Sequence, residues 1–262
     1  VSAYTQNLPL AVFCGILMGI VMGIFMGYFH ILMNTNLILT GVAINTFTRG
    51  ATVMILYTFT GDKGSSSLVK SLAVGNWDIP VIKDIPILGQ ILSGHNGFTY
   101  FAFLAVIFTW FLMYRTPLGL RIRAVGENSS AAESVGENPA KSKLIALGFS
   151  GFFSALGGMY MSMGNMSVFI TNMTGGRGFI GVAADAMGRG NPIGAMLASL
   201  LFGAANAVAN VLQINNFPVD MVMAIPYVVS IAGIIIYSAN EQHRKNSRVK
   251  QAIRAAEREE TA

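Results

Sequence analysis

The chain has 262 residues, of which 53% are hydrophobic and only 11% are charged. Soluble domains carry roughly 25% charged residues, so this composition excludes a water-soluble globular protein. The formal net charge of +5 does not indicate a nucleic-acid-binding protein, because the basic residues gather in two stretches beside apolar segments. One cysteine, Cys14, and three scattered histidines give neither a disulfide framework nor the spacing of a metal site.

Six apolar segments follow one another along the chain. A run of about 20 apolar residues crosses the roughly 30 Å hydrocarbon core of a bilayer. We therefore predict an all-α fold, a polytopic transmembrane helical bundle that occupies residues 1–239. The segments are Pro9–Met33, Leu37–Phe59, Phe98–Tyr114, Leu144–Met163, Phe179–Leu212 and Val219–Ala239.

Glycines in the first and fifth of these segments give further information about helix packing. The first has glycines at every fourth position, which lets another helix approach that face closely: Gly15, Gly19, Gly23 and Gly27. Packing within the chain and contact with another subunit both fit this pattern. The fifth segment is interrupted at Gly188–Pro192, so we expect a broken helix pair there that adds two passes.

The distribution of charge predicts the orientation of the bundle. The loop Arg115–Lys143 holds five Lys and Arg residues and the tail 240–262 holds six, whereas the loop Gly61–Asn96 has three lysines matched by three aspartates. An excess of Lys and Arg marks the cytoplasmic side of a membrane protein. We therefore predict that loop Arg115–Lys143 and the basic tail are cytoplasmic. Loop Gly61–Asn96 is then extracytoplasmic, with an ordered element at Ile79–Gly89.

The loop Arg115–Lys143 is longer than a simple turn and contains signals for a short helix. Ser130 is placed to cap this helix, with Glu133 completing a capping box. Gly136 suits a left-handed C-terminal residue, and Pro139 stops the helix. A helix of one or two turns is unstable alone, so it needs a surface on its own protein or on a partner. A solvated loop with a chance capping pattern is the alternative.

Longer stretches around this loop carry a family resemblance. TPLGLRIRAVGEN, AAESVGENPAKSK and SGFFSALGGMYMS follow one another, and GRGFIGVAADAMGRGNPIGAMLASLLFGAANAV comes later. In this order they resemble the permease subunits of ABC importers in the branched-chain amino acid, ribose and nucleoside group. LTGVAINTFTRGATVMILY and DIPILG are similar to the nucleoside branch more than to the sugar branch. Such permeases usually carry further membrane segments ahead of the first one here, so we expect a truncated or divergent permease.

The resemblance implies a role for the loop and a set of partners. It makes Ser129–Gly136 a coupling helix seated in a groove of a separate ABC ATPase subunit. It also implies a second permease subunit, identical or homologous, and an extracytoplasmic solute-binding lipoprotein, all at the cytoplasmic membrane of a bacterium. The candidate ATPase-coupling residues are Gly126, Glu127, Asn128, Ser129, Ser130, Ala131, Ala132, Glu133, Gly136 and Pro139.

The chain has no sequence signature for hydrolysing ATP or for other catalysis. No G-x-x-x-x-G-K-[ST] motif occurs, and GDKGSSS in the loop Gly61–Asn96 lacks the Gly-Lys-Ser/Thr element. We therefore expect a transport subunit that is not an enzyme, with no catalytic residues and no cofactor of its own. ATP would bind to the partner ATPase.

Several polar residues lie within the apolar segments, where an ionisable group is costly unless it faces a cavity or a partner. One interpretation is that they line a translocation path for a polar solute. The alternative is an internal pair of Arg49 with Asp185, together with amide bonds between helices. The candidates are Asn45, Arg49, Asp185, Asn206 and Asn210.

The sequence thus predicts a permease subunit of an ATP-driven importer that works by alternating access on a small polar solute, with a nucleoside as the expected cargo. Two other transporters remain open: a ribose-type sugar permease, and an ion-coupled secondary transporter that would use Asp185 as its coupling carboxylate. An integral membrane enzyme would need a catalytic cluster near one interface, and the sequence offers none.

Overall fold

A computed structural model describes residues 2–67, 69, 72–77 and 93–214, together with positions 228, 231–233 and 235. The chain divides into two compact units, Val1–Gly175 (unit 1) and Gly176–Ala262 (unit 2). The predicted element at Ile79–Gly89, the basic tail and most of the predicted last segment lie outside the described residues.

Five helical spans within the described residues are long and apolar enough to cross a membrane. Four of them overlap the first four predicted segments, and the fifth covers the longer second part of the predicted segment Phe179–Leu212, so the polytopic helical fold is confirmed. A helix of 23 residues is about 34 Å long at 1.5 Å per residue, enough for a bilayer core. The spans are α2 (Leu8–Leu32), α3 (Leu37–Thr60), α5 (Gly97–Arg115), α8 (Pro139–Met159) continued by the π-helix η1 (Tyr160–Asn165), and α10 (Pro192–Ile214).

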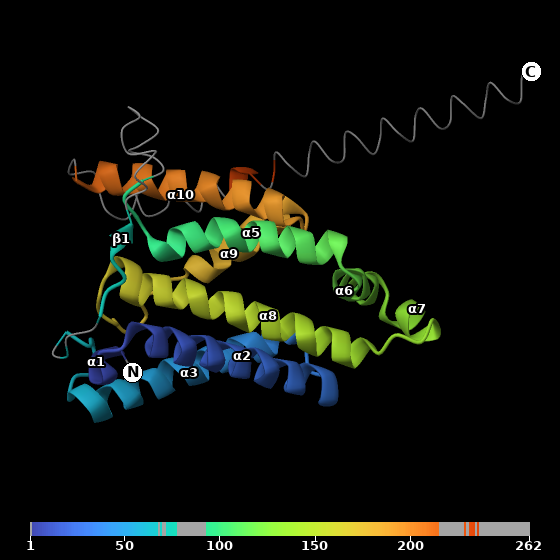
Figure 1. Cartoon of the computed structure of the whole chain (residues 1–262), viewed down its shortest axis with the longest axis horizontal. Coiled ribbons are helices and arrows are strands. Elements are labelled where there is room, and N and C mark those ends of the chain that lie inside the picture. Colours follow the sequence, from blue (N-terminus) through green and yellow to red (C-terminus); the bar gives the residue numbers. More distant parts are fainter. Residues whose placement is uncertain are drawn as a thin grey trace, which may run out of the picture. The chain divides into compact units, whose positions relative to one another are not determined.

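Shorter elements connect these spans. Among the described residues, unit 1 adds three helices, α1 (Ser2–Thr5), α6 (Pro117–Glu127) and α7 (Ser129–Ser134), and one antiparallel pair of strands, β1 (Asn76–Trp77) and β2 (His95–Asn96). Unit 2 adds α9 (Arg177–Gly188). In unit 1, α6 and α7 lie beyond one end of α8, whereas β1 lies near its other end (Figure 1).

The glycine face of α2 packs against α8, and the two helices run antiparallel (Figure 1). A Cβ at Gly15 would meet the Met159 side chain, whereas one at Gly27 would meet the side chains of Leu144 and Leu147. Between them, a Cβ at Gly23 would lie only 3.2 Å from the Cα of Gly151. The prediction of tight packing is confirmed, and it is packing within the chain: absent side chains allow the two backbones to touch.

At the end of unit 1 near β1 and η1, hydrogen bonds from backbone and side-chain groups hold the chain together. Ser66 donates its backbone N–H to the carbonyl of Phe169 over 2.8 Å, and its hydroxyl accepts from the Phe169 N–H over the same distance. The amide of Asn96, which is 6% exposed, donates to the carbonyls of Val74 and Gly164. These bonds fasten the two described ends of loop Gly61–Asn96 to the chain that contains and follows η1.

In unit 2, α9 and α10 form the predicted broken pair. A turn separates them, with φ of 58° at Arg189 and 65° at Gly190. A Cβ at Gly194 would lie 2.9 Å from the Cα of Gly188, so the two helices meet at this turn without side chains between them. The expectation that the pair adds two full passes is wrong for α9, because its 12 residues reach only about 18 Å.

Candidate functional site

The loop predicted at Arg115–Lys143 contains two helices, not one. The first, α6, begins where Thr116 caps it, its hydroxyl accepting from the Gly119 N–H over 3.2 Å, and Pro117 fills the first helical position. A Cβ at Gly119 would lie 2.5 Å from the Cα of Met113, so only glycine lets α6 fold back on the end of α5. The prediction missed α6, although Thr-Pro followed by apolar residues at helical spacing is a start signal.

The second helix, α7, is separated from α6 by one residue, Asn128, which joins the two. Its backbone N–H closes α6 on the carbonyl of Ala124 over 3.0 Å, and its side-chain oxygen accepts from the Ala131 N–H over 3.0 Å. The predicted cap was Ser130, which is wrong: Ser130 already lies inside the helix, and its backbone carbonyl accepts the Ser134 hydroxyl. Asn128 is the cap instead, and an Asn side-chain oxygen caps a helix as well as a Ser hydroxyl does.

The C-terminus of α7 is closed as predicted by Gly136 in the left-handed conformation, with φ of 87°. The Gly136 N–H donates to the carbonyl of Glu133 over 2.9 Å, and the Glu137 N–H donates to that of Ala132 over 3.1 Å. This pair of bonds is a Schellman motif. Pro139 then starts α8, with Asn138 as its cap. A helix of six residues is thus fixed at both ends.

The two faces of α7 differ in what they contact. Ala132 is only 4% exposed and packs on its own chain, whereas the neighbouring Ala131 remains exposed. Val135 is 84% exposed, the largest fraction of any large apolar side chain in the described part of the chain. Its neighbours on the outer surface of α7 are also exposed: Ser130, Ala131, Glu133 and Ser134.

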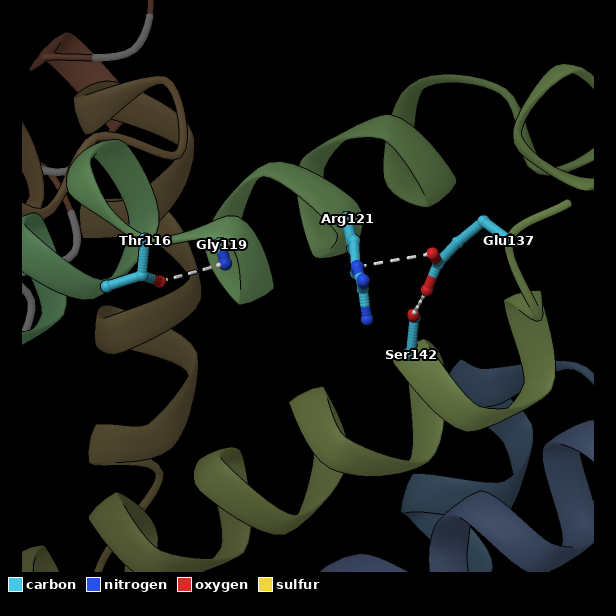
Figure 2. A network of polar contacts seen from close by, with 5 residues as sticks. All are labelled: Thr116, Gly119, Arg121, Glu137 and Ser142. Atoms are coloured by element: carbon cyan, nitrogen blue, oxygen red, sulfur yellow. Dashed lines mark hydrogen bonds and ion pairs between the residues drawn. The ribbon is translucent and has the colours of Figure 1, made fainter. Parts of the chain in front are cut away.

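A carboxylate between α7 and α8 connects three elements (Figure 2). Oε1 of Glu137 accepts from the buried hydroxyl of Ser142 over 3.0 Å, and Oε2 lies 3.3 Å from Nε of Arg121 on α6. Glu137 was not among the predicted site residues. The sequence identifies Arg121 only as one of the five basic residues of the loop Arg115–Lys143. No local pattern signals a contact between residues 121 and 137, because it depends on how α6 folds back.

An apolar cavity of about 260 Å³ lies beside this network. It separates α6 from α8 and from the end of α2, where the ring nitrogen Nδ1 of His30 bonds the carbonyl of Thr35 over 2.8 Å. The packing of α6 on the rest of unit 1 is therefore incomplete. The lining residues are His30, Leu37, Ile122, Val125, Gly126, Ser142, Lys143, Ala146 and Leu147.

Basic residues surround the start of the loop. The guanidinium of Arg123 lies 4.8 Å from the ring centre of Tyr114, and that of Arg115 lies 5.9 Å from the ring of Trp110. Both contacts are within cation–π distance. They place two positive charges at the end of α5, next to aromatic rings of the kind that anchor helices at a membrane interface.

The predicted translocation-path residues lie on three helices in the two units. Asn45 and Arg49, four residues apart, are exposed on α3 in unit 1. In unit 2, Asp185 is exposed on α9, whereas α10 carries a half-buried Asn206 and an exposed Asn210. The path and the Arg49–Asp185 pair both stay predictions. The described residues contain no group of three or more metal-ligating side chains.

Comparison with known proteins places these features in a family. Residues 1–236 match the family described as branched-chain amino acid transport system / permease component. The guanosine ABC transporter permease protein NupQ of Bacillus subtilis is 33% identical over 200 residues, which cover 74% of this chain and 62% of NupQ. The nucleoside ABC transporter permease protein NupC of Lactococcus lactis is 30% identical over 205 residues, 76% of this chain and 64% of NupC.

The chain is also similar, at lower identity, to a sugar permease. The ribose import permease protein RbsC of Bacillus subtilis is 27% identical over 153 residues, 55% of this chain and 44% of RbsC. No solved structure matches the chain significantly. The chain spans somewhat less than two thirds of the length of NupQ and NupC. It is a multi-pass membrane protein and belongs to the permease component family of branched-chain amino acid transport systems.

Proposed function

We propose that this chain is the transmembrane permease subunit of an ATP-driven importer in the cytoplasmic membrane of a bacterium, and that it moves a nucleoside by alternating access. The main support for the proposal is the exposed outer surface of α7. This short helix, capped at both ends, leaves its outer surface and Val135 free for a partner. The names of the relatives NupQ and NupC support a nucleoside as cargo.

The proposed orientation places α7 in the cytoplasm. The loop that contains it carries five Lys and Arg residues, the excess expected on that side. Val135 lies outside the five helical spans that are long and apolar enough to cross a membrane. An exposed valine on a water-facing helix suits the buried centre of an interface, where apolar side chains concentrate. A groove of a separate ATPase subunit is the proposed occupant, and ATP binds there.

The mechanism follows from the packing of unit 1. Closure of the ATPase subunits on ATP displaces α7, and α7 is connected through its caps to α6 and α8. Because α8 touches α2 backbone to backbone along the glycine face, these two helices move as a pair. Their tilt opens the path to one side of the membrane and then to the other. A second permease subunit completes the path, and an extracytoplasmic lipoprotein delivers the solute.

The docking assignment is tested with Val135→Asp. A charge at the centre of an apolar contact is costly to desolvate, so the ATPase should no longer co-purify with the permease from native membranes. Asn76→Asp adds the same charge at the opposite polar end of unit 1 and should leave co-purification unchanged. Normal ATPase recovery with Val135→Asp would reject α7 as the docking element.

A sugar permease is the second candidate, favoured by the similarity to the ribose permease RbsC. Uptake assays with labelled guanosine and labelled ribose distinguish the two: the proposal expects guanosine uptake that unlabelled ribose does not inhibit. An ion-coupled transporter would use Asp185 and run on a proton or sodium gradient. The proposal expects uptake to survive collapse of these gradients as long as ATP is present.

A further inference from the structure

We propose that Glu137 is a positioning residue that couples α7 to the moving helices, a role that rests on the proposed docking of α7. Glu137 contacts three elements at once. Its backbone N–H closes α7 on the carbonyl of Ala132, and its two carboxylate oxygens reach Arg121 on α6 and Ser142 on α8. Figure 2 shows Arg121 and Ser142 approaching this carboxylate from two directions.

The exposure of these side chains indicates that the contacts of Glu137 position the helices more than they stabilise the fold. The side chain of Arg121 is 63% exposed and that of Glu137 is 24% exposed. A pair this exposed is screened by water and adds little to the free energy of folding. Ser142, in contrast, is 5% exposed, and a buried hydroxyl holds its partner firmly. The carboxylate is therefore fixed to α8 on one side and holds α6 through an adaptable ion pair on the other.

A cavity lies next to this link, beside Ser142. Ile122 and Val125 of α6 face an apolar space shared with Ala146 and Leu147 of α8. Where side chains do not fill the gap between two helices, dispersion contacts there are lost. The carboxylate bridge adds a polar link between α6 and α8 at this end, next to the apolar contacts that bury Val125. With the bridge broken, a displacement of α7 would move α6 into the cavity and would not be passed on to α8.

The bridge is therefore predicted to affect coupling and not docking. With Glu137→Ala, the outer surface of α7 is unchanged, so ATPase co-purification should stay within twofold of the wild type. Uptake of labelled guanosine per ATP hydrolysed should fall about tenfold. Arg121→Glu should have a similar effect, and the exchanged pair Arg121→Glu with Glu137→Arg should recover at least half of the wild-type ratio. A purely structural role would instead lower protein level and ATPase co-purification together with uptake in the single variants.

A distance measurement tests the same inference without any cargo. Spin labels on Ser134→Cys in α7 and Ser154→Cys in α8, in a Cys14→Ala background, report the position of α7 in the purified complex. We expect one narrow distance distribution with Glu137 present and a clearly broader one with Glu137→Ala. Glu137→Gln, which keeps an oxygen for Ser142 but loses the charge, should lie between them. If the milder Glu137→Gln alone is stable enough to purify, any broadening relative to the wild type supports the inference.

The outcomes separate this inference from the docking assignment. Loss of ATPase binding in Val135→Asp, with unchanged distances and unchanged uptake per ATP in the Glu137 variants, would overturn the role of Glu137 alone. ATPase binding that survives Val135→Asp would reject the docking of α7 whatever the Glu137 variants do. Broader distances in Glu137→Ala together with normal uptake per ATP would also overturn the coupling role.

Discussion

The contact between α2 and α8 and the loop from α6 to α8 are held together by different means. Along α2 and α8, Gly19 and Gly23 bring the two backbones into direct contact at Gly151, and Gly15 and Gly27 leave room for side chains of α8 on either side. In the loop, a few side-chain bonds of Asn128 and Glu137 connect short helices beside a cavity. The first arrangement resists any change in shape, whereas the second can be loosened one bond at a time. The proposed transport mechanism uses both: the helix pair would move as one body, and the loop would be the adjustable joint that moves it.

The largest effect is expected where backbone meets backbone. Gly23→Val places a Cβ against the Leu147 carbonyl. The same Cβ lies 3.2 Å from the Cα of Gly151, closer than ordinary van der Waals contact. Neither partner can rotate away, so α2 and α8 must separate, at a cost of about 3 kcal/mol, the upper end for overpacking. Thermal unfolding of the purified protein should show a clearly lowered Tm. Gly148→Val, on α8 with nothing within 4 Å of the added Cβ, serves as the control and should unfold near the wild-type Tm.

The next effect concerns the cap of α7. Asn128→Ala removes the oxygen that accepts from the Ala131 N–H, and loss of such a cap costs about 1 kcal/mol. Hydrogen exchange of the α7 amides should then be about fivefold faster, the factor that corresponds to 1 kcal/mol. Ser130→Ala is the matched comparison and should leave exchange unchanged. Faster exchange in Ser130→Ala than in Asn128→Ala would restore Ser130 as the cap.

The smallest effect is expected at the opposite polar end of unit 1. Hydrogen bonds, first of all from the Gly64 N–H and then from Ser65, lower the pKa of the Asp62 carboxyl, with burial opposing them. Since the folded pKa lies below the ordinary value, the contribution of these bonds is complete above that ordinary value. It is lost only as the pH falls through the lowered pKa. NMR titration of labelled aspartate should show this low midpoint, and an ordinary midpoint would contradict the turn geometry.

The sequence predicted most of what depends on hydropathy and on glycine. The positions of α2, α3, α5 and α10, the close glycine contact of α2, the turn after Gly188 and the left-handed Gly136 all follow from local patterns. Each depends on residues near in the chain or on a repeat along one helix. Such features do not need knowledge of tertiary contacts.

The details of the loop could not be predicted in the same way. Ser130 and Asn128 are both good caps, and only the fold of α6 decides between them. Ala132 is buried within its own chain whereas Ala131 is exposed, and no local pattern distinguishes these two neighbouring alanines. The contact of Arg121 with Glu137 spans 16 positions and requires α6 to fold back at Gly119. The candidate path residues Asn45, Arg49, Asp185, Asn206 and Asn210 stay predictions.

The central claim, that α7 meets an ATPase in the cytoplasm, has a direct test in cells. Val135→Cys in a Cys14→Ala background places the single reactive thiol of the chain on the exposed surface of α7. We predict that a photoactivatable thiol crosslinker attached there captures an ABC ATPase subunit, and that a membrane-impermeant maleimide added to intact cells does not react. Labelling from outside intact cells, without an ATPase adduct, would contradict both the orientation and the docking role.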